Sequence, residues 1–377
     1  ISPSYWDYQA RLTYRPTARD ELGLFVFGSD DQLGIYSHTD NPAVTQDFSS
    51  HTYYVRTVAS WLHRFAQGAT LSVIGSVGYD APSQSRSQSP TSTITSDAHL
   101  LSYTLRATTR VPLTGWLRLD GGLDFEGNFY SLDQARDTEG IAPASRAFSL
   151  YTHHLGPWVS AELSFLDHKL TITPQLRLQL FTFLGYPGES MQFSSAFVEP
   201  DPRIRLRYQV LPWLALKAGF GLYHQAPQSQ RLSPYTGNPE LGPESALHYV
   251  LGIEFLPMAK LHINLDGFYK DLRDLVVRGK YANDPLYVND ATGVVYGGEL
   301  LVRLDLWKNL FGWVSYTLSR SERQDHPDSE SRIFEYDQTH ILALIASYKL
   351  PLGFQVGLRF RYVTGNPTTP VLGAAYD

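Results

Sequence analysis

The sequence of 377 residues contains no cysteine, which excludes disulfide frameworks, thiolate zinc sites and cysteine nucleophiles. No window approaches the ~18 uninterrupted apolar residues of a transmembrane helix. The net charge of −6 is small for this length and does not indicate a nucleic-acid partner. Neither a phosphate-binding glycine loop nor an H-E-x-x-H sequence occurs, so we expect neither an enzyme nor a bound cofactor.

The abundant residues favour strands and turns. The chain has 24 Tyr, 19 Phe and 7 Trp, together with 29 Gly and 23 Pro. Aromatic residues are enriched in strands, whereas Gly and Pro are enriched in turns. The composition therefore predicts an all-β chain.

Apolar and polar residues alternate with a period of two along many segments. Successive side chains of a strand point to opposite faces, so each such segment predicts a strand with one apolar and one polar face. The clearest examples are residues 117–125, 170–180, 203–210 and 354–362. One explanation is a soluble antiparallel sheet with one face in water.

Two features favour a membrane barrel over a soluble sheet. The predicted strands run about 10 to 14 residues, close to the ~9–11 that a tilted membrane strand needs. Tight turns alternate with long polar segments about eight times, as in up-and-down outer-membrane barrels. The sequence therefore predicts a transmembrane antiparallel up-and-down β-barrel, with about 16 strands in this chain.

The long polar segments are expected on the outer side of the membrane. The most biased of them, Ala81 to Asp97, has the composition of a flexible loop. The expected outer segments are residues 28–49, 80–96, 127–152, 183–200, 224–244, 271–292 and 321–336.

Both ends of the chain are expected on the side of these long segments. The first strand runs from near Ser4 into a tight turn near Pro16, and the last leaves a tight turn near Pro351 and ends near Val363. Complete barrels of this type keep both termini on the short-turn side. We therefore expect residues 1–377 to form one partial transmembrane barrel domain, without a plug domain and without the terminal strands.

The stretch GNPELGPESALHYVLGIEF, Gly237 to Phe255, resembles the N-P-x-L-x-P-E segment of TonB-dependent outer-membrane receptors. Further segments that resemble this family follow in the family's order. They are Ile263–Val277, Tyr287–Arg303 with Asn289, Gly298 and Glu299 in place, Trp313–Glu322, and Phe334–Val371 with its D-Q-x-H sequence. The resemblance covers about Tyr223 to Val371.

The resemblance implies a barrel of ~22 strands with a plugged lumen in the outer membrane of a diderm bacterium. It also implies a plug domain and a TonB-type energy-coupling complex as partners. The cargo would be a scarce ligand such as a siderophore, cobalamin, a glycan or a peptide. Two alternatives stay open: a passive porin, and a non-transporting structural subunit of a split barrel assembled with other outer-membrane subunits.

Ligand capture is expected in the outer loops, where aromatic and polar side chains gather. The candidate ligand-binding residues are Tyr235, Asn238, Tyr281 and Tyr287. The residues expected to line the lumen are Arg203, Arg205, Arg207, Glu299, Arg303, Arg359 and Arg361. These charges either guide a charged ligand or pair with one another, with water or with a plug.

Two further residue types have simpler interpretations. His153 and His154 are adjacent on a predicted strand and so point to opposite faces, which disfavours a shared metal ion. Trp residues near strand ends are expected to form interfacial girdles. They are Trp116, Trp158, Trp213, Trp307 and Trp313.

Overall fold

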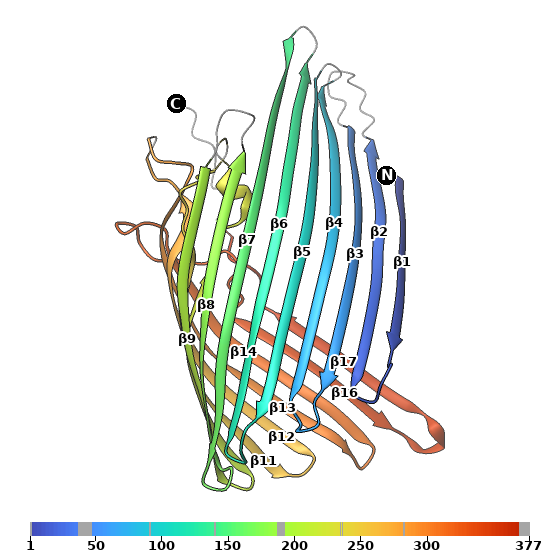
Figure 1. Cartoon of the computed structure of the whole chain (residues 1–377), viewed down its shortest axis with the longest axis vertical. Helices are drawn as coiled ribbons and strands as arrows, with labels where there is room; N and C mark the ends of the chain where they lie inside the picture. Colours follow the sequence, from blue (N-terminus) through green and yellow to red (C-terminus); the bar gives the residue numbers. More distant parts are fainter. Residues whose placement is uncertain are drawn as a thin grey trace.

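The computed structural model describes residues 2–36, 47–89, 92–138, 141–186, 193–233, 235, 237–281 and 283–368. Its described part is one antiparallel sheet that curls around a hollow, with two single-turn 3-10 helices, η2 (Ser229–Leu232) and η3 (Pro351–Gly353) (Figure 1). None of the helices in the described ranges has the length and apolar character needed to cross a membrane.

Sixteen strands are long, in agreement with the number expected from the sequence, and β15 has two residues. The strands are β1 (Ser2–Tyr14), β2 (Asp20–Tyr36), β3 (Asp47–Arg64), β4 (Thr70–Ser89), β5 (Ser92–Pro112), β6 (Leu117–Thr138), β7 (Ile141–Phe165), β8 (Leu170–Tyr186), β9 (Phe193–Leu211), β10 (Leu214–Gln225), β11 (Glu244–Met258), β12 (Leu261–Arg278), β13 (Tyr287–Trp307), β14 (Leu310–Gln324), β15 (Arg332–Ile333), β16 (His340–Lys349) and β17 (Gln355–Val363).

Each long strand pairs antiparallel with its neighbours in the sequence, from β1–β2 to β16–β17, with β14 pairing directly to β16. Among the described residues, no pairing joins β1 to β17. Strands β1–β7 stand nearly upright in Figure 1, and β11–β17 cross behind them at a tilt. This is the predicted all-β, up-and-down antiparallel architecture of an outer-membrane barrel.

The eight tight turns lie where the sequence places them. Left-handed backbone closes several of them, for example at Lys308 (φ 47°) and Asn309 (φ 72°) between β13 and β14. Asn adopts this region more readily than most residues. Because the turns are so short, the register of each hairpin is set by its turn. The start of β1 and the end of β17 lie at the end of the sheet that carries the long connections.

Several predicted outer loops are instead continuations of the strands. Residues 80–96 and 127–152 were expected as loops, but β4, β5, β6 and β7 run through most of them, and β7 alone has 25 residues, roughly 80 Å of strand. The polar side chains pair across the hairpins: Ser83 Oγ donates to Asp97 Oδ1 at 2.5 Å, and Ser87 and Thr93 hydroxyls lie 3.4 Å apart. Ser/Thr pairs of this kind support a ladder without an apolar face, so composition alone misidentified these segments as loops.

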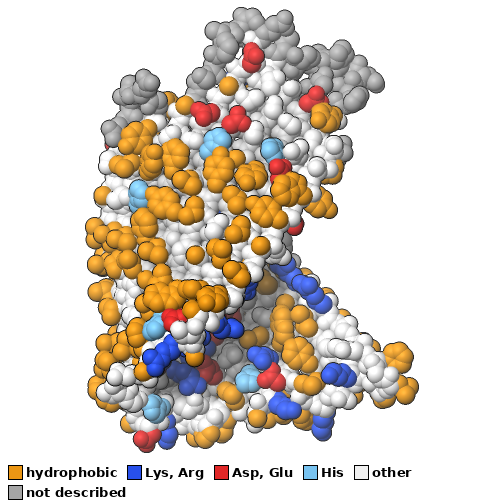
Figure 2. Space-filling model, turned by 45° about the vertical axis from the view of Figure 1, so that its right-hand side comes forward, with side chains coloured by type: hydrophobic (Ala, Val, Ile, Leu, Met, Phe, Trp, Pro, Cys, Tyr) orange, Lys and Arg blue, Asp and Glu red, His pale blue; other side chains and the backbone are white. Residues whose placement is uncertain are grey.

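The register separates an apolar outer face from a polar inner face. On β9 to β12 one continuous row of opposed residues is Ile204, Phe220, Tyr249 and Tyr269. Directly opposed residues share a face of the sheet. Figure 2 shows hydrophobic side chains spread over the wall and Lys and Arg gathered around the hollow in the lower half of the view.

The register corrects two of the expected girdle positions. Trp158 lies opposite Arg177, and Trp313 lies opposite Arg303, so both indoles belong to the polar inner face. Trp313 does lie near the start of β14, whereas Trp158 lies inside β7 and away from its ends. One residue of shift along a strand moves a side chain to the other face.

A small apolar core closes the inner face at the long-connection end of β7 and β8. Its buried residues are Phe148, Leu150, Phe181, Phe183, Leu232 and Leu241. Four come from β7 and β8, and Leu232 and Leu241 come from the connection between β10 and β11. The connection is thereby held against the inside of the wall.

We expect Leu251→Arg to destabilise the inserted barrel by about 2–4 kcal/mol, because Leu251 lies near the middle of β11 on the lipid face and is 70% exposed. Val250→Arg on the same strand is the matched control, since Val250 faces inward and its new guanidinium remains in the polar hollow. Reversible denaturant unfolding in lipid vesicles measures the difference. Equal losses in the two variants would contradict the assigned faces.

We expect the Asp20 carboxyl, at the short-turn end outside the membrane, to stay ionised at pH 3. Hydrogen bonds from His63, Thr17 and Trp61 lower its pKa from 3.8 to about 2. Since the folded pKa is depressed, the stabilisation from these contacts is complete above the unfolded pKa and is lost as the pH falls towards 2. The carboxyl carbon-13 shift of Asp20, assigned with Asp20→Asn, should titrate with a midpoint clearly below that of an unstructured Asp.

Candidate functional site

A hollow of about 1030 Å³ lies along the inner face of β7 to β13. Its wall combines polar and apolar side chains from several adjacent strands. The charged residues that line it are Glu162, Arg203, Arg205, Arg207, Lys217, Asp266, Lys270 and Glu299. The three arginines of β9 therefore lie on one face of the sheet.

The most buried charge on this face is Asp201, whose side chain has no exposed surface. Its carboxylate accepts hydrogen bonds from Gln179 Nε2 at 2.6 Å and Arg203 Nη2 at 2.9 Å, and His224 Nδ1 lies 2.8 Å away. The Arg203 guanidinium also lies 4.1 Å from the centre of the Tyr223 ring. Such a buried carboxylate is tolerated only because it has several donors.

A second network, of ion pairs, lies nearer to the short turns than the first. Arg207 Nη2 donates to Glu254 Oε2 at 2.7 Å, and Lys217 Nζ pairs with Asp266 Oδ1 at 2.9 Å. Lys217 also lies 3.9 Å from Glu254 Oε1, which links the two pairs. Within this network the positive and negative groups are matched in number.

The other predicted lumen residues differ in whether they form ion pairs. Arg303 pairs with Asp305 at 2.8 Å. In the described part of the chain, no ion pair forms at Arg205, Glu299, Arg359 or Arg361, all of which are exposed on the inner face. The inner face therefore combines a neutralised network with four charges that are unpaired among the described residues, three of them arginines and one the carboxylate of Glu299.

The sequence analysis did not single out Asp201, His224 or Lys217. Asp201 lies two residues before Arg203 and so shares its face, but the run was ended by Pro200 and Pro202. Both prolines occupy outward positions of β9, opposite Leu178 and Leu176. Extending the alternation through them would have found the carboxylate.

The connection between β10 and β11 packs against the inner face of β7 and β8 at the long-connection end. Asn238 Nδ2 donates to the backbone oxygen of Tyr287 at 2.9 Å, and Asn238 Oδ1 accepts from the Glu240 amide at 2.9 Å. Asn289 Oδ1 accepts from the Gly242 amide at 2.9 Å, and its Nδ2 donates to the backbone oxygens of Gly242 and Asp274. These two asparagines tie the connection to β13.

The D-Q-x-H sequence has the same kind of role. Asp337, which is buried, accepts from the Ser321 amide at 2.7 Å and from the Thr339 hydroxyl at 3.0 Å. His340 Nδ1 lies 2.8 Å from the Tyr316 hydroxyl. The polar residues of the quoted segments thus attach the connections to the strands.

The four candidate ligand residues differ in accessibility. Tyr235 is 44% exposed and Tyr281 is 65% exposed. Asn238 is buried with its amide engaged, and Tyr287 packs against the apolar core with Arg231 over its ring at 5.4 Å. Tyr281 follows Lys280, which forms an ion pair with Asp328 of the connection after β14 and so links two outer segments.

The two adjacent histidines do point to opposite faces. His153 Nε2 lies 2.8 Å from the Tyr103 hydroxyl on the outer face, and His154 Nε2 lies 2.5 Å from Gln179 Oε1 on the inner face. Across the described ranges no group of three or more His, Asp or Glu side chains is placed to hold a metal ion.

The family described as "TonB dependent receptor-like, beta-barrel" matches residues 2–376. The chain belongs to the TonB-dependent receptor β-barrel family. Members of this family are outer-membrane proteins, and the family consists of receptors and transporters rather than enzymes. For the TonB-dependent receptors in general, a plug domain and an interaction with TonB accompany this barrel.

Individual relatives of this TonB-dependent receptor barrel are distant. An iron-regulated outer membrane virulence protein of Vibrio cholerae serotype O1 is 24% identical over 183 residues, which is 42% of this chain and 27% of the relative. The ferripyoverdine receptor of Pseudomonas aeruginosa has a similar fold (TM-score 0.75, 13% identity, 97% of this chain and 58% of that chain). The unliganded ferric citrate transporter also does (TM-score 0.73, 14% identity, 93% and 56%).

The chain therefore spans about a quarter of the curated relative and less than three-fifths of these two solved structures. Structural likeness at this level of identity shows the fold alone.

We expect Asn289→Ala to release the connection between β10 and β11, because three hydrogen bonds are lost and Gly242 and Asp274 keep unpaired backbone groups. Trypsin cleavage after Arg231, in this connection, should become about tenfold faster, corresponding to a local loss of roughly 1–2 kcal/mol. Asn264→Ala, which removes an unbonded inner-face amide of β12, is the control. Equal cleavage rates in both variants would contradict this role of Asn289.

Proposed function

We propose that this chain forms the barrel wall of a receptor that imports an anionic ferric chelate with energy from a TonB-type complex. The energy would reach the cargo through a plug domain held in the hollow. The observation that carries the proposal is the uncompensated positive charge of the inner face, at Arg205, Arg359 and Arg361. The receptor family and the iron-related names of its relatives support it.

Charges on a concave wall focus the electric field and so act on a charged ligand at a distance. A concave wall of one sign between low-dielectric surfaces raises the local concentration of oppositely charged ligands. The matched network around Lys217 contributes little to that field, since its charges cancel at short range. Arg205 of β9 does contribute, because it has no carboxylate partner among the described residues.

Capture would take place where the outer connections meet. Tyr235 and Tyr281 present exposed aromatic rings there, and the ion pair between Lys280 and Asp328 holds the second ring's segment in place. Asn238 and Tyr287 would act indirectly, by holding the connection that carries Tyr235. Aromatic rings of this kind can stack on the planar groups of a chelator.

The test measures uptake of iron-55 by cells that make the full-length protein. The iron is supplied in separate experiments as ferric citrate, as a ferric hydroxamate and as a ferric catecholate. We expect one of these chelates to be taken up in a saturable manner, and we expect a protonophore to abolish that uptake. Arg205→Ala should lower it about fivefold or more through loss of a charged contact, and Tyr235→Ala combined with Tyr281→Ala should raise the half-saturation concentration. Thr317→Ala, a neutral inner-face change, is the control.

Uptake that rises linearly with chelate concentration and ignores the protonophore would contradict energy coupling and would indicate a passive porin. Saturable, protonophore-sensitive uptake that is unchanged by Arg205→Ala would overturn the assigned role of the inner-face charge.

A further inference from the structure

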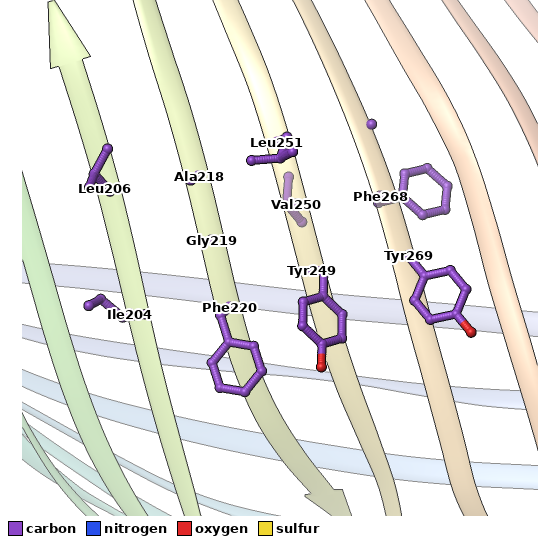
Figure 3. Close-up of a pocket in the computed structure, with 11 residues that line it drawn as sticks. Ile204, Leu206, Ala218, Gly219, Phe220, Tyr249, Val250, Leu251, Phe268 and Tyr269 are labelled. Carbon is purple, nitrogen blue, oxygen red and sulfur yellow. The ribbon is translucent and has the colours of Figure 1, made fainter.

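The outer face of β9 to β12 carries an apolar groove of about 550 Å³ (Figure 3). One row of opposed residues across these strands is Leu206, Ala218, Leu251 and Gly267. Ala218 and Gly267 contribute almost no side chain, so the wall is notched on both sides of Leu251, which is 70% exposed. The groove is the space that these two small residues leave.

The notch at Gly267 is open space. A Cβ at this position would have no heavy atom nearer than 3.9 Å. The glycine is therefore not required by a close approach of a neighbouring strand, and a larger side chain would fit there. What the small residue leaves is an apolar recess in a surface otherwise covered by branched and aromatic side chains.

Two tyrosines mark one end of the groove. Tyr249 and Tyr269 lie side by side with ring centres 6.3 Å apart, and Phe220 lies 5.3 Å from Tyr249. Figure 3 shows both tyrosine oxygens directed towards the lower part of the view, the direction in which the arrow of β10 runs and hence the end with the long connections. Neither hydroxyl has a hydrogen-bond partner among the residues the structure describes.

We propose that this groove binds one acyl chain of a lipid from the leaflet on the side of the long connections, and that Tyr249 and Tyr269 donate hydrogen bonds to the carbonyl that links the chain to its headgroup. The outer face lies in hydrocarbon, where an empty recess forfeits the dispersion contacts of its lining. Tyrosine places its ring in the acyl region and its hydroxyl at the headgroup level. The orientation of both hydroxyls selects the leaflet.

The experiment is native mass spectrometry of the full-length protein, purified from outer membranes in a mild detergent, stripped of lipid and titrated with lipid A. The acyl chains of this probe are attached through ester and amide carbonyls. We expect one retained lipid per protein. Gly267→Leu should raise its dissociation constant at least about fivefold by filling the recess, and Ala218→Leu should do the same.

The matched control is Gly75→Leu. Gly75 lies on the outer face of β4, where a Cβ would also meet nothing nearer than 3.7 Å, so the same substitution is made on the wall away from the groove. This variant should bind the lipid as the unmodified protein does. The heat-dependent electrophoretic shift of folded barrels verifies that every variant is folded.

Tyr249→Phe combined with Tyr269→Phe tests the hydroxyls. It should weaken binding of lipid A by about tenfold, and it should leave binding of an ether-linked dialkyl lipid, which lacks the carbonyl, unchanged. Affinity of Gly267→Leu equal to that of Gly75→Leu would overturn the groove as a lipid site. The groove would also be overturned as a lipid site if the spectra showed a second copy of the protein, and no lipid, bound to the unmodified protein and lost from Gly267→Leu. Equal affinity for lipid A with and without the two tyrosine hydroxyls would overturn the leaflet assignment.

Discussion

Every backbone amide and carbonyl of a strand that crosses hydrocarbon needs a partner on a neighbouring strand, because lipid offers none. The antiparallel pairing from β1 to β17 meets this requirement for every strand between them, and it also determines where each side chain points. Since the side-chain period is two, the pairing that protects the backbone simultaneously sorts the chain into a lipid face and an inner face. The site and the lipid groove both depend on this sorting.

On the inner face, the same pairing concentrates charge. Side chains on this face reach past β10, so Arg207 of β9 pairs with Glu254 of β11, and Arg203 pairs with Asp201, two residues earlier on the same strand. Arg207 and Lys217, which lie directly opposite each other, are neutralised in this way, whereas Arg205, opposite Gly219, forms no ion pair among the described residues. A receptor wall of this kind is stabilised by its matched pairs and can act on a cargo through the charge that remains.

The connection between β10 and β11 joins the wall to the outer segments. Leu232 and Leu241 are almost fully buried against β7 and β8, and the two asparagines attach the connection to β13. His224, near the end of the strand that enters the connection, contacts the buried Asp201. A change in the outer connection is therefore placed to reach the charged network below it.

The stretch from Gly237 to Phe255 illustrates what could be read in advance. Its prolines stop short of the ladder and pairing begins at Glu244, because a residue without an amide hydrogen cannot donate to a neighbouring strand. The alternation after it identified the lipid face, including Leu251. The stretch does not specify which residues of other segments it will contact. The hydrogen bonds of the two asparagines and the burial of Leu241 are therefore visible only in the folded chain.

The sequence by itself determined the class of fold, the number of long strands, the eight tight turns and the inner position of the arginines, since all of these follow from local period and local turn chemistry. Tertiary structure alone decided which arginines are neutralised, which tyrosines stay exposed, where the strands extend past the membrane and where the lipid face is notched. These properties depend on which residue of the next strand lies opposite, and a register between strands is a relation that no single segment encodes.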